Sequence, residues 1–360
     1  MKFLDLFAGV GGFRLGMESA GHKCIGFCEI DKFARASYKA IHNTKGEIEL
    51  HDITAVSDEF IRGIGRVDII CGGFPCQAFS IAGARRGFED TRGTLFFEIA
   101  RFASILRPRY LFLENVKGLL NHDRGNTFEI ILSALDELGY NVEWENINSK
   151  NFGVPQNRER VFIIGHLRGE RTRRIFPLGG ESQSISSQSV VKIGNVTPSG
   201  NGMNGEVYQA DGLAPTLTTN KGEGQKIAIK SNAIKQFGVL QPNFNQCGVV
   251  YETDGIAPTI RAYQGGGLEP KIIQRGHGYN QGGEHDIAPT LTSNSYQENN
   301  HLSFGYRIRK LTPRECWRLQ GFPDWAFDKA QEVNSNSQLY KQAGNSVTVN
   351  VIAAIAKEFR

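Results

Sequence analysis

Three segments of the chain carry side chains that could together form a catalytic site. In GGFPCQ, Cys76 follows two glycines and a proline; Glu114 opens ENV; Arg158 and Arg160 belong to QNRER. A presented thiolate is a strong nucleophile. A glutamate at the end of an apolar strand is partly desolvated, which raises its pKa and lets it donate a proton. Two guanidiniums on one face of an extended segment can hold a carbonyl or phosphate oxygen.

Each of these side chains also has a simpler structural interpretation. A lone cysteine is most often a small buried side chain, a glutamate such as Glu114 an exposed acid or helix cap, and an arginine pair a surface charge cluster. For Cys76 the buried interpretation is weakened, because Cys71 already fills the preceding strand and Pro75 stiffens the chain. We therefore take Cys76 as a candidate nucleophile.

The elements that must position these residues alternate between strands and helices. Amphipathic or apolar helical spacing appears over residues 13–20, 93–107 and 126–139. Strand–helix alternation predicts an α/β fold with a parallel sheet covered on both faces, whose ligands bind at the carboxyl ends of the strands. The predicted strands are KFLDLF, CIGFCEI, VDIICGG, YLFLENV and RVFIIGH.

A glycine-rich turn, DLFAGVGG, follows the first predicted strand and opens a helix, where a nucleotide-like cofactor would bind. The dinucleotide fingerprint G-x-G-x-x-G is broken, because Gly9 and Gly11 are followed by Arg14 at the last position. This disfavours a nicotinamide oxidoreductase. Glu29, at the end of the second strand, is suited to accept hydrogen bonds from ribose hydroxyls. The simpler alternative is a tight turn that packs helix on strand.

The composition changes near residue 177, where Gly, Ser, Asn and Gln become frequent and a repeat appears. Its copies begin at Asp211, Asp254 and Asp286 and share the tripeptide Ala-Pro-Thr. They are either a recurring strand–turn unit or a recognition loop in several copies. We predict three segments: a catalytic domain over 1–180, a second domain over 181–305, and a return segment over 306–360. In the last segment helical character returns with LTPRECWRLQGF. The segment ends in an apolar helix capped at Asn345–Ser346 that packs back onto the large domain.

Composition limits the class of protein. The chain has 360 residues, 40% of them hydrophobic, and a net charge of +4, which permits a polyanionic partner without requiring one. Its six cysteines form no CxxC pair, so we expect no metal site and a reducing compartment. The longest apolar runs are too short to span a membrane. We expect a cytoplasmic monomer.

Taken in order along the chain, these motifs resemble the DNA (cytosine-5)-methyltransferases, most closely the bacterial modification enzymes. The resemblance covers roughly residues 1–176 and 305–360. It implies a Rossmann-like S-adenosylmethionine-dependent methyltransferase fold, with a smaller, irregular, β-rich target-recognition domain in the middle. The segments that carry it are DLFAGVGG, Glu29, HDIT, GGFPCQAFS, GFEDTRGTLFFEIAR, ENV, QNRERVFIIG, RKLTPRECWRLQGFP and QAGNSV.

The resemblance implies S-adenosylmethionine as methyl donor, S-adenosylhomocysteine as product and no metal. Cys76 would attack C6 of a cytosine flipped out of double-stranded DNA, Glu114 would act at N3, and Arg160, with Arg158, would hold the O2 side. C5 would then take the methyl group. The residues implied to hold the cofactor are Phe7, Gly9, Gly11, Glu29, Ile30, Asp52, Ile53, Pro75, Asn345, Ser346 and Val347.

The DNA contacts are expected in the segment after Cys76 and in the repeat domain. Ala82 stands where some relatives have a serine that fills the space left by the flipped base, so the infiltrating residue is open, with Gln246 a candidate. The repeat copy that reads the site is also open. Thr290 lies 19 residues before Arg309, a spacing close to that of relatives, whereas the copy with Thr259 matches their loop better in sequence and is favoured here. Basic clusters at Arg168–Arg174 and Arg307–Arg318 could contact phosphates. The expected DNA-binding residues are Gln77, Ser80, Arg85, Arg86, Thr216, Gln246, Thr259, Tyr263 and Thr290.

Two other functions share much of this sequence pattern. RNA is a rival substrate, although a recognition domain of this size favours duplex DNA. A silent DNA-binding protein that keeps the fold is a second rival, and the intact set of Cys76, Glu114 and Arg160 argues against it. A modification enzyme would protect DNA from a cognate restriction endonuclease acting separately, in the cytoplasm of a bacterial or phage-infected cell, associated with the nucleoid.

Overall fold

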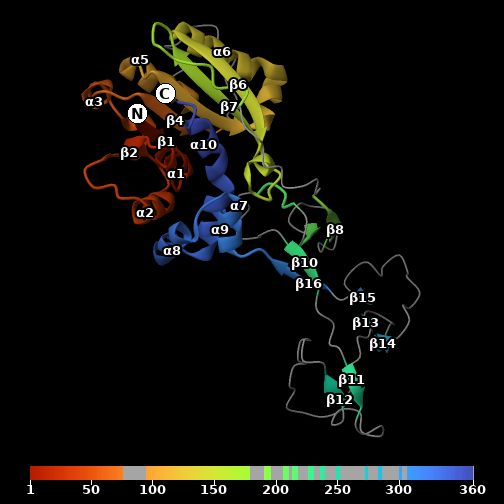
Figure 1. Ribbon diagram of the computed structural model, residues 1–360. Coiled ribbons are helices and arrows are strands. Elements are labelled where there is room, and N and C mark those ends of the chain that lie inside the picture. Colours follow the sequence, from red (N-terminus) through yellow and green to blue (C-terminus); the bar gives the residue numbers. More distant parts are fainter. Residues whose placement is uncertain are drawn as a thin grey trace. The chain divides into compact units, whose positions relative to one another are not determined.

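The computed structural model of the chain contains two compact units (Figure 1). The large unit comprises Met1–Val190, Gly212–Glu223 and Thr312–Arg360, and the small unit Val191–Asp211 and Gly224–Leu311. The contacts thus group residues 212–223 with the large unit, whereas the sequence predicts a second domain over 181–305. The residues that the structure describes are 1–75, 95–178, 190–195, 206–210, 213–217, 226–230, 236–239, 249–251, 272–274, 283–285, 300–301 and 306–359.

A seven-stranded sheet forms the centre of the large unit, in the order β3-β2-β1-β4-β5-β7-β6. The first five strands in that order pair in parallel, whereas β7 runs antiparallel to both of its neighbours. This confirms the predicted mostly parallel α/β sheet. The strands are β1 (Lys2–Leu6), β2 (Lys23–Cys28), β3 (Ile48–Leu50), β4 (Ile69–Gly73), β5 (Tyr110–Val116), β6 (Tyr140–Asn148) and β7 (Glu159–Leu167).

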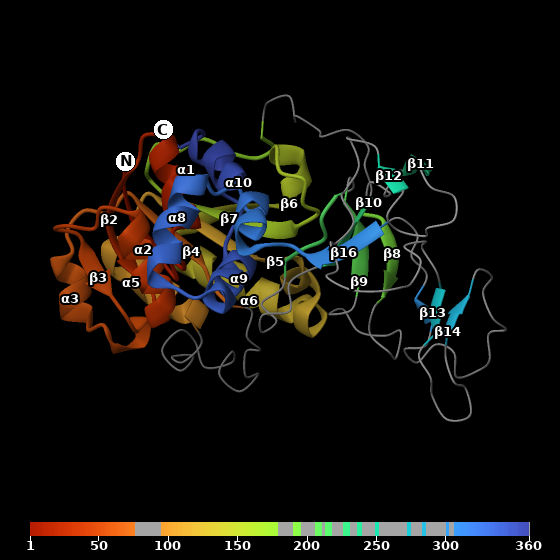
Figure 2. The ribbon, with the colours of Figure 1, turned by 90° about the horizontal axis from the view of Figure 1, so that it is seen from below.

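Alternating apolar residues along the central strands build a core on each face of the sheet. In β5, Leu111 and Leu113 pack on one face, while Tyr110 and Phe112 pack on the other. Helices α3 (Asp58–Gly63), α5 (Leu95–Leu106) and α6 (Asn126–Glu137) supply the first core, and α1 (Gly12–Ser19) and α10 (Val349–Ala356) the second. Figure 2 shows α1 and α10 side by side, so the two ends of the chain close one layer.

The return segment contains more helices than the sequence predicted. Besides α10 and α7 (Pro313–Leu319), which lies in the helical segment LTPRECWRLQGF, it forms α8 (Asp324–Val333) and α9 (Asn336–Asn345). The predicted Asn–Ser cap is wrong: Asn345 is the last residue of α9 and Ser346 its C-cap, while α10 begins only at Val349. The remaining helical elements are α2 (Lys32–Ile41) and the 3-10 turns η1 (Ile53–Ala55), η2 (Lys117–Gly125) and η3 (Ser149–Phe152). Among the described residues, none of the helices combines the length and apolarity that a membrane span requires.

The described elements of the small unit are all strands. Its largest sheet has the order β16-β10-β9-β8. The chain first enters the small unit at β8 and finally leaves it after β16, and both strands belong to this sheet. The strands are β8 (Lys192–Asn195), β9 (Glu206–Gln209), β10 (Lys226–Lys230), β11 (Gln236–Val239), β12 (Val249–Tyr251), β13 (Ile272–Gln274), β14 (Gly283–His285), β15 (Asn300–His301) and β16 (Tyr306–Lys310).

We predict that Gly16→Ala destabilises the large unit. A Cβ at Gly16 would lie 2.5 Å from Cβ of Ile352, so α1 and α10 would have to separate. Overpacking of this kind costs about 1–3 kcal/mol, which urea unfolding would measure. Gly63→Ala is the matched control, because nothing lies within 4 Å of its added methyl group. Equal unfolding free energies for the two variants would contradict tight α1–α10 packing.

Candidate active site

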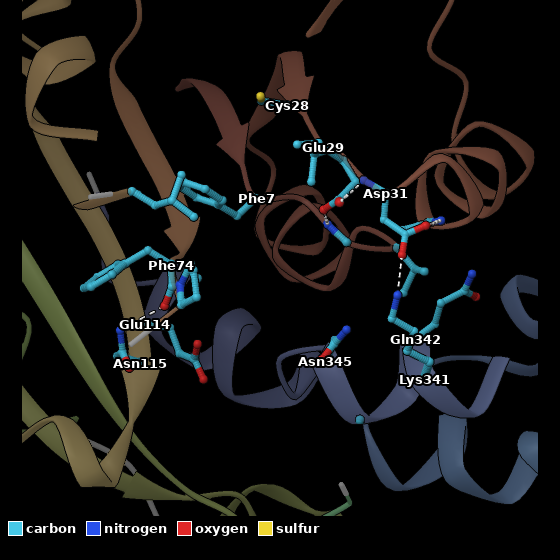
Figure 3. A pocket seen from close by; sticks show the side chains of 18 of the residues that line it. Phe7, Cys28, Glu29, Asp31, Phe74, Glu114, Asn115, Lys341, Gln342 and Asn345 are labelled. Atoms are coloured by element: carbon cyan, nitrogen blue, oxygen red, sulfur yellow. Dashed lines mark hydrogen bonds and ion pairs between the residues drawn. The ribbon is translucent and has the colours of Figure 1, made fainter. Parts of the chain in front are cut away.

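A cavity of about 750 Å³ opens at the carboxyl edge of the large sheet (Figure 3). Its wall comes from the turn after β1, the ends of β2, β4 and β5, the start of β7, α9 and residues 216–217. The predicted site residues that line it are Phe7, Gly9, Glu29, Ile30, Asp52, Ile53, Pro75, Glu114, Arg158, Arg160, Thr216 and Asn345. The predicted residues Cys76, Gln77, Ser80, Arg85, Arg86, Gln246, Thr259, Tyr263 and Thr290 lie outside the described residues.

Glu29 is fixed at one end of the cavity by two backbone amides. Gly9 N–H donates to Oε2 at 2.8 Å, and Asp31 N–H donates to Oε1 at 2.7 Å. Burial raises the pKa of Glu29, although both hydrogen bonds favour the ionised form and oppose that rise. The glycine turn therefore orients a carboxylate whose remaining lone pairs can accept hydrogen bonds from a diol.

The glycine turn requires left-handed backbone conformations and lets the segment around Ser346 approach its backbone closely. Phe7, Gly9 and Gly11 have φ of 56°, 56° and 88°, a region that favours glycine. A side chain at Gly12 would meet Oγ of Ser346 at 2.8 Å. The turn thus packs directly against the segment after α9, which explains why Asn345 reaches the cavity although it lies more than 300 residues further along the chain.

Arg14, at the position of the third fingerprint glycine, has a structural role. Its buried guanidinium pairs with Glu47 at 2.7 Å and with Glu18 at 2.9 Å, which ties α1 to the loop before β3. A dinucleotide-binding turn uses a glycine at this position for close helix–strand packing. The geometry here is therefore different, in agreement with the broken fingerprint.

Asp52 and Ile53 form the wall beside Glu29. Asp52 accepts hydrogen bonds from Thr54 N–H at 2.9 Å and from its hydroxyl at 2.7 Å, and these bonds lower the pKa of Asp52. Arg101 of α5 donates to the carbonyl of Ile53 at 3.0 Å and pairs with Asp58 at 2.8 Å. Sequence reasoning missed Arg101, because nothing in a helical arginine indicates which loop it will hold.

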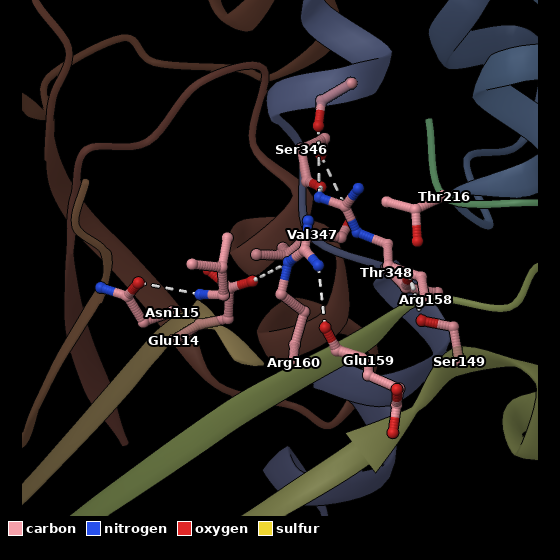
Figure 4. A network of polar contacts seen from close by, with 12 residues as sticks. Glu114, Asn115, Ser149, Arg158, Glu159, Arg160, Thr216, Ser346, Val347 and Thr348 are labelled. Atoms are coloured by element: carbon pink, nitrogen blue, oxygen red, sulfur yellow. Dashed lines mark hydrogen bonds and ion pairs between the residues drawn. The ribbon is translucent and has the colours of Figure 1, made fainter. Parts of the chain in front are cut away.

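Glu114 and Arg160 form an ion pair at the other end of the cavity (Figure 4). Nε of Arg160 lies 3.0 Å from Oε1 of Glu114, and both side chains are largely buried. A Cβ at Gly73 would lie 3.1 Å from Oε2 of Glu114, so this glycine leaves room for the carboxylate. Burial raises the pKa of Glu114 and outweighs the opposing charges of Arg160 and Arg158. Glu114 is therefore an acid that can keep its proton at a pH above the ordinary pKa of a glutamate.

Arg158 is more deeply buried than Arg160 and is held by backbone carbonyls. Its Nη2 donates to the carbonyl of Ser346 at 2.7 Å and to that of Gly344 at 3.2 Å, and Nη1 donates to that of Leu217 at 3.4 Å. Burial, together with the charge of Arg160, lowers the pKa of Arg158 to about 9. Arg158 therefore links β7, the return segment and residues 213–217, and only Arg160 of the two contacts Glu114 directly.

Asn115, next to Glu114, holds the chain that leads to Cys76. Its Nδ2 donates to the carbonyl of Phe74 at 2.9 Å, and its Oδ1 accepts from Val116 N–H at 2.8 Å. The contact joins the ends of β4 and β5. The sequence showed Asn115 within ENV, but only the sheet order shows which backbone it binds.

Helix α9 is fastened to α2 at the rim of the cavity. Lys341 pairs with Asp31 at 2.6 Å, and Asp31 also caps α2 by accepting from Phe33 N–H at 2.8 Å. Gln342 accepts from the hydroxyl of Ser37 at 3.0 Å. These contacts explain how a helix that the sequence did not predict comes to line the cavity.

The predicted phosphate-binding cluster Arg168–Arg174 is misplaced. It follows β7, and the eight residue steps from Arg160 to Arg168 span roughly 27 Å at about 3.4 Å per residue. It therefore lies toward the opposite edge of the sheet. Three of its four arginines also form ion pairs within the protein, namely Arg168 with Asp136, Arg173 with Glu358 and Arg174 with Glu143. Intramolecular pairing and position both argue against contact with DNA at this site.

Comparison with known proteins identifies the family. The whole chain, residues 1–360, matches the family model of the C-5 cytosine-specific DNA methylases. It is 39% identical over 363 residues to type II methyltransferase M.HpaII of Haemophilus parainfluenzae, covering 99% of this chain and 88% of that protein. It is 35% identical over 433 residues to orphan methyltransferase M.SPRI of Bacillus phage SPR, covering 99% and 97%. The crystal structure of S. pombe Dnmt2 methyltransferase aligns with a TM-score of 0.59 at 17% identity, over 98% of this chain and 96% of that chain.

The chain therefore belongs to the C-5 cytosine-specific DNA methylase family. It is a DNA (cytosine-5)-methyltransferase, related to the type II modification methylases of bacteria and to phage enzymes. The resemblance inferred from the motifs is confirmed, and the structural alignment supports the α/β fold.

We predict that Asn115→Ala slows methyl transfer to DNA. Loss of the Asn115 amide leaves the Phe74 carbonyl without its side-chain donor. Misplacement of a catalytic group by about 1 Å can lower the rate roughly 10²-fold. Single-turnover methylation would measure the effect. Asn126→Ala, which removes an exposed side-chain contact to Asp123, is the matched control and should keep the wild-type rate. An unchanged rate in Asn115→Ala would rule out this positioning role.

Proposed function

We propose that the enzyme methylates C5 of a flipped-out cytosine in a specific double-stranded DNA sequence, through a covalent bond between Cys76 and C6. The observation that carries this proposal is the Glu114–Arg160 pair at 3.0 Å, at the end of β5. Beside it, Asn115 holds the backbone of Phe74, two residues before Cys76. Glu114, Arg160 and the backbone that precedes Cys76 thus line the same cavity as the carboxylate of Glu29.

S-adenosylmethionine is the methyl donor that the family and fold support. When bound, it supplies an electrophilic methyl group on a sulfonium. Glu29 would accept from its ribose hydroxyls, Asp52 with Ile53 would hold its adenine, and Asn345 with the following Ser346 and Val347 would face its methionine end. The fixed carboxylate of Glu29 fits a diol, and a cavity of about 750 Å³ is within the usual range for a cofactor-sized ligand.

The protein's own groups account for activation of the cytosine. The thiolate of Cys76 adds to C6, and electron density moves to N3, where the proton on Glu114 neutralises it. Arg160, aligned by Glu114, would donate to O2. C5 becomes nucleophilic enough to accept the methyl group, which leaves S-adenosylhomocysteine. The C5 proton then passes to water, the C6–S bond breaks with its electron pair returning to the Cys76 thiolate, and N3 returns its proton to Glu114. Proton donation of this kind is typically worth about 10²–10⁴-fold.

The DNA side of the proposal rests on the family and on chain organisation. Because C5 and C6 are inaccessible in stacked DNA, the base must be extruded, at a cost of a few kcal/mol. We propose that the small unit, Val191–Asp211 and Gly224–Leu311, recognises the target sequence. We also propose that the enzyme acts as a monomer and that its methylation protects DNA from a separate restriction endonuclease. Methylation assays on DNA and on RNA of the same sequence would test the preference for duplex DNA.

Covalent trapping tests the mechanism directly. DNA with 5-fluorocytosine at the target should form an adduct that survives denaturation, because fluorine at C5 blocks the last elimination. Cys76→Ala should form none, whereas Cys316→Ala, which removes a cysteine buried in α7, should form it normally. Mass spectrometry of the adduct would locate the modified residue. Absence of an adduct on DNA that the enzyme methylates would refute the covalent mechanism.

The pH dependence of the rate tests the role of Glu114. Its pKa is raised by burial, so the acid stays protonated above the ordinary glutamate value of about 4.3, and the rate should fall as pH rises through the raised pKa. Arg158 and Arg160 are the charged groups that oppose this rise. Arg160→Met should therefore move the falling limb to higher pH, besides lowering the rate. Single-turnover rates across pH would show it, and an unmoved limb would mean that another group titrates.

A further inference from the structure

We propose that the first Ala-Pro-Thr copy is a structural strap of the catalytic cavity, and that Thr216 is a positioning residue for Arg158 and the start of β7. The strap is defined as residues 213–217. The inference rests on the proposed function, because it takes Arg158 and Arg160 as parts of the methyl-transfer site. It replaces the base-reading role that the sequence predicted for Thr216.

The strap pairs by its backbone with the segment that leads into β7. Ala214 N–H donates to the carbonyl of Pro155 at 2.8 Å, and Asn157 N–H donates to the carbonyl of Ala214 at 2.8 Å. Together they form a parallel bridge between Gln156 and Ala214. The strap is thus part of the large unit. It is bound to the segment that ends at Asn157, the residue before Arg158.

Side chains of the strap strengthen this attachment. The Thr216 hydroxyl donates to the carbonyl of Asn157 at 2.8 Å. Leu213 and Leu217 are 3% and 6% exposed, so the strap is anchored by a buried side chain on each side of Thr216. A base-reading loop needs its polar groups accessible in a groove of the DNA. The engaged hydroxyl and the buried flanking leucines are instead typical of a structural segment.

The strap and the return segment hold Arg158 between them. Leu217 supplies a carbonyl to Nη1 at 3.4 Å, while Gly344 and Ser346 supply carbonyls to Nη2 at 3.2 and 2.7 Å. Thr216 and Arg158 both line the cavity, and Figure 4 shows them close to each other on the side of the network away from Glu114. A shift of the strap would therefore move the Arg158 guanidinium, whose charge acts on Glu114.

The three repeat copies are therefore not equivalent. The first belongs to the large unit by its contacts, as part of Gly212–Glu223. Target reading would then fall to the copies that contain Thr259 and Thr290. The same tripeptide would serve as a wall of the cavity in one place and as a recognition element in another.

The test compares the same substitution in all three copies. Thr216→Val keeps the shape of the side chain but removes the hydroxyl that holds the Asn157 carbonyl. We expect it to lower kcat by roughly 10- to 100-fold, since small misplacements of catalytic groups have effects of this size. KM for DNA and the methylated sequence should stay unchanged. Thr216→Ser, which restores the hydroxyl, should recover most of the rate. Thr259→Val and Thr290→Val are the matched controls and should change KM or the methylated sequence rather than kcat.

Three measurements decide the outcome: steady-state kinetics, bisulfite sequencing of methylated DNA, and thermal unfolding. A low kcat in Thr216→Val, rescued by Thr216→Ser at an equal unfolding temperature, supports the strap. A wild-type kcat, a changed target sequence, or loss of activity that Thr216→Ser does not rescue would overturn it. Failure of the proposed function is recognised separately, because wild type would then give no 5-methylcytosine in the same assay or Cys76→Ala would retain it.

Discussion

The antiparallel pairing of β7 with β5 is the constraint on which the site depends. In this pairing Glu114 lies opposite Phe162 and Val116 opposite Arg160, so the start of β7 meets the carboxyl end of β5. In a parallel arrangement the start of β7 would lie at the other edge of the sheet, roughly 27 Å away for a strand of this length. The ion pair between Glu114 and Arg160 exists because one strand is reversed.

The return of the chain is the second requirement. Helix α10 packs on α1 where Gly16 permits close approach, and Gly12 admits the backbone around Ser346. The same segment supplies two carbonyls to Arg158. The glycine turn near the N-terminus and the Arg158 carbonyl cage are thereby built on the same few C-terminal residues. Loss of the α1–α10 contact would therefore disturb both ends of the cavity together.

The electrostatics of the site follow from unequal burial of its charges. Glu114 is desolvated, which favours its neutral form, while Arg158 and Arg160 favour its ionised form. Arg160 contacts the carboxylate, whereas the charge of Arg158 acts from within a cage of carbonyls. A carboxyl group under opposing influences of this kind can exchange a proton with a bound base. If the strap positions Arg158 as proposed, it tunes this balance without contacting the acid.

The types of the site residues, and the edge of the sheet at which they gather, can be predicted from the sequence. Apolar runs ending in Glu29, Gly73 and Glu114 identified the central strands, because strands buried on both faces read as continuous hydrophobic segments. Edge strands β3 and β6 were missed, since β6 is partly exposed and mixes Glu and Asn with apolar residues. Ordered motifs also specified the family, which the comparisons confirm.

Which of these residues contact one another depends on the three-dimensional fold. It assigned Asn345 and Ser346 to the end of α9, paired Arg168 with Asp136 far from the cavity, and attached Thr216 to Asn157. Local patterns report propensity and burial over a few residues, whereas these contacts depend on strand order, strand direction and the return of distant segments. The chemistry available to the chain was thus readable from its sequence, and the partner of each group was set by packing across the fold.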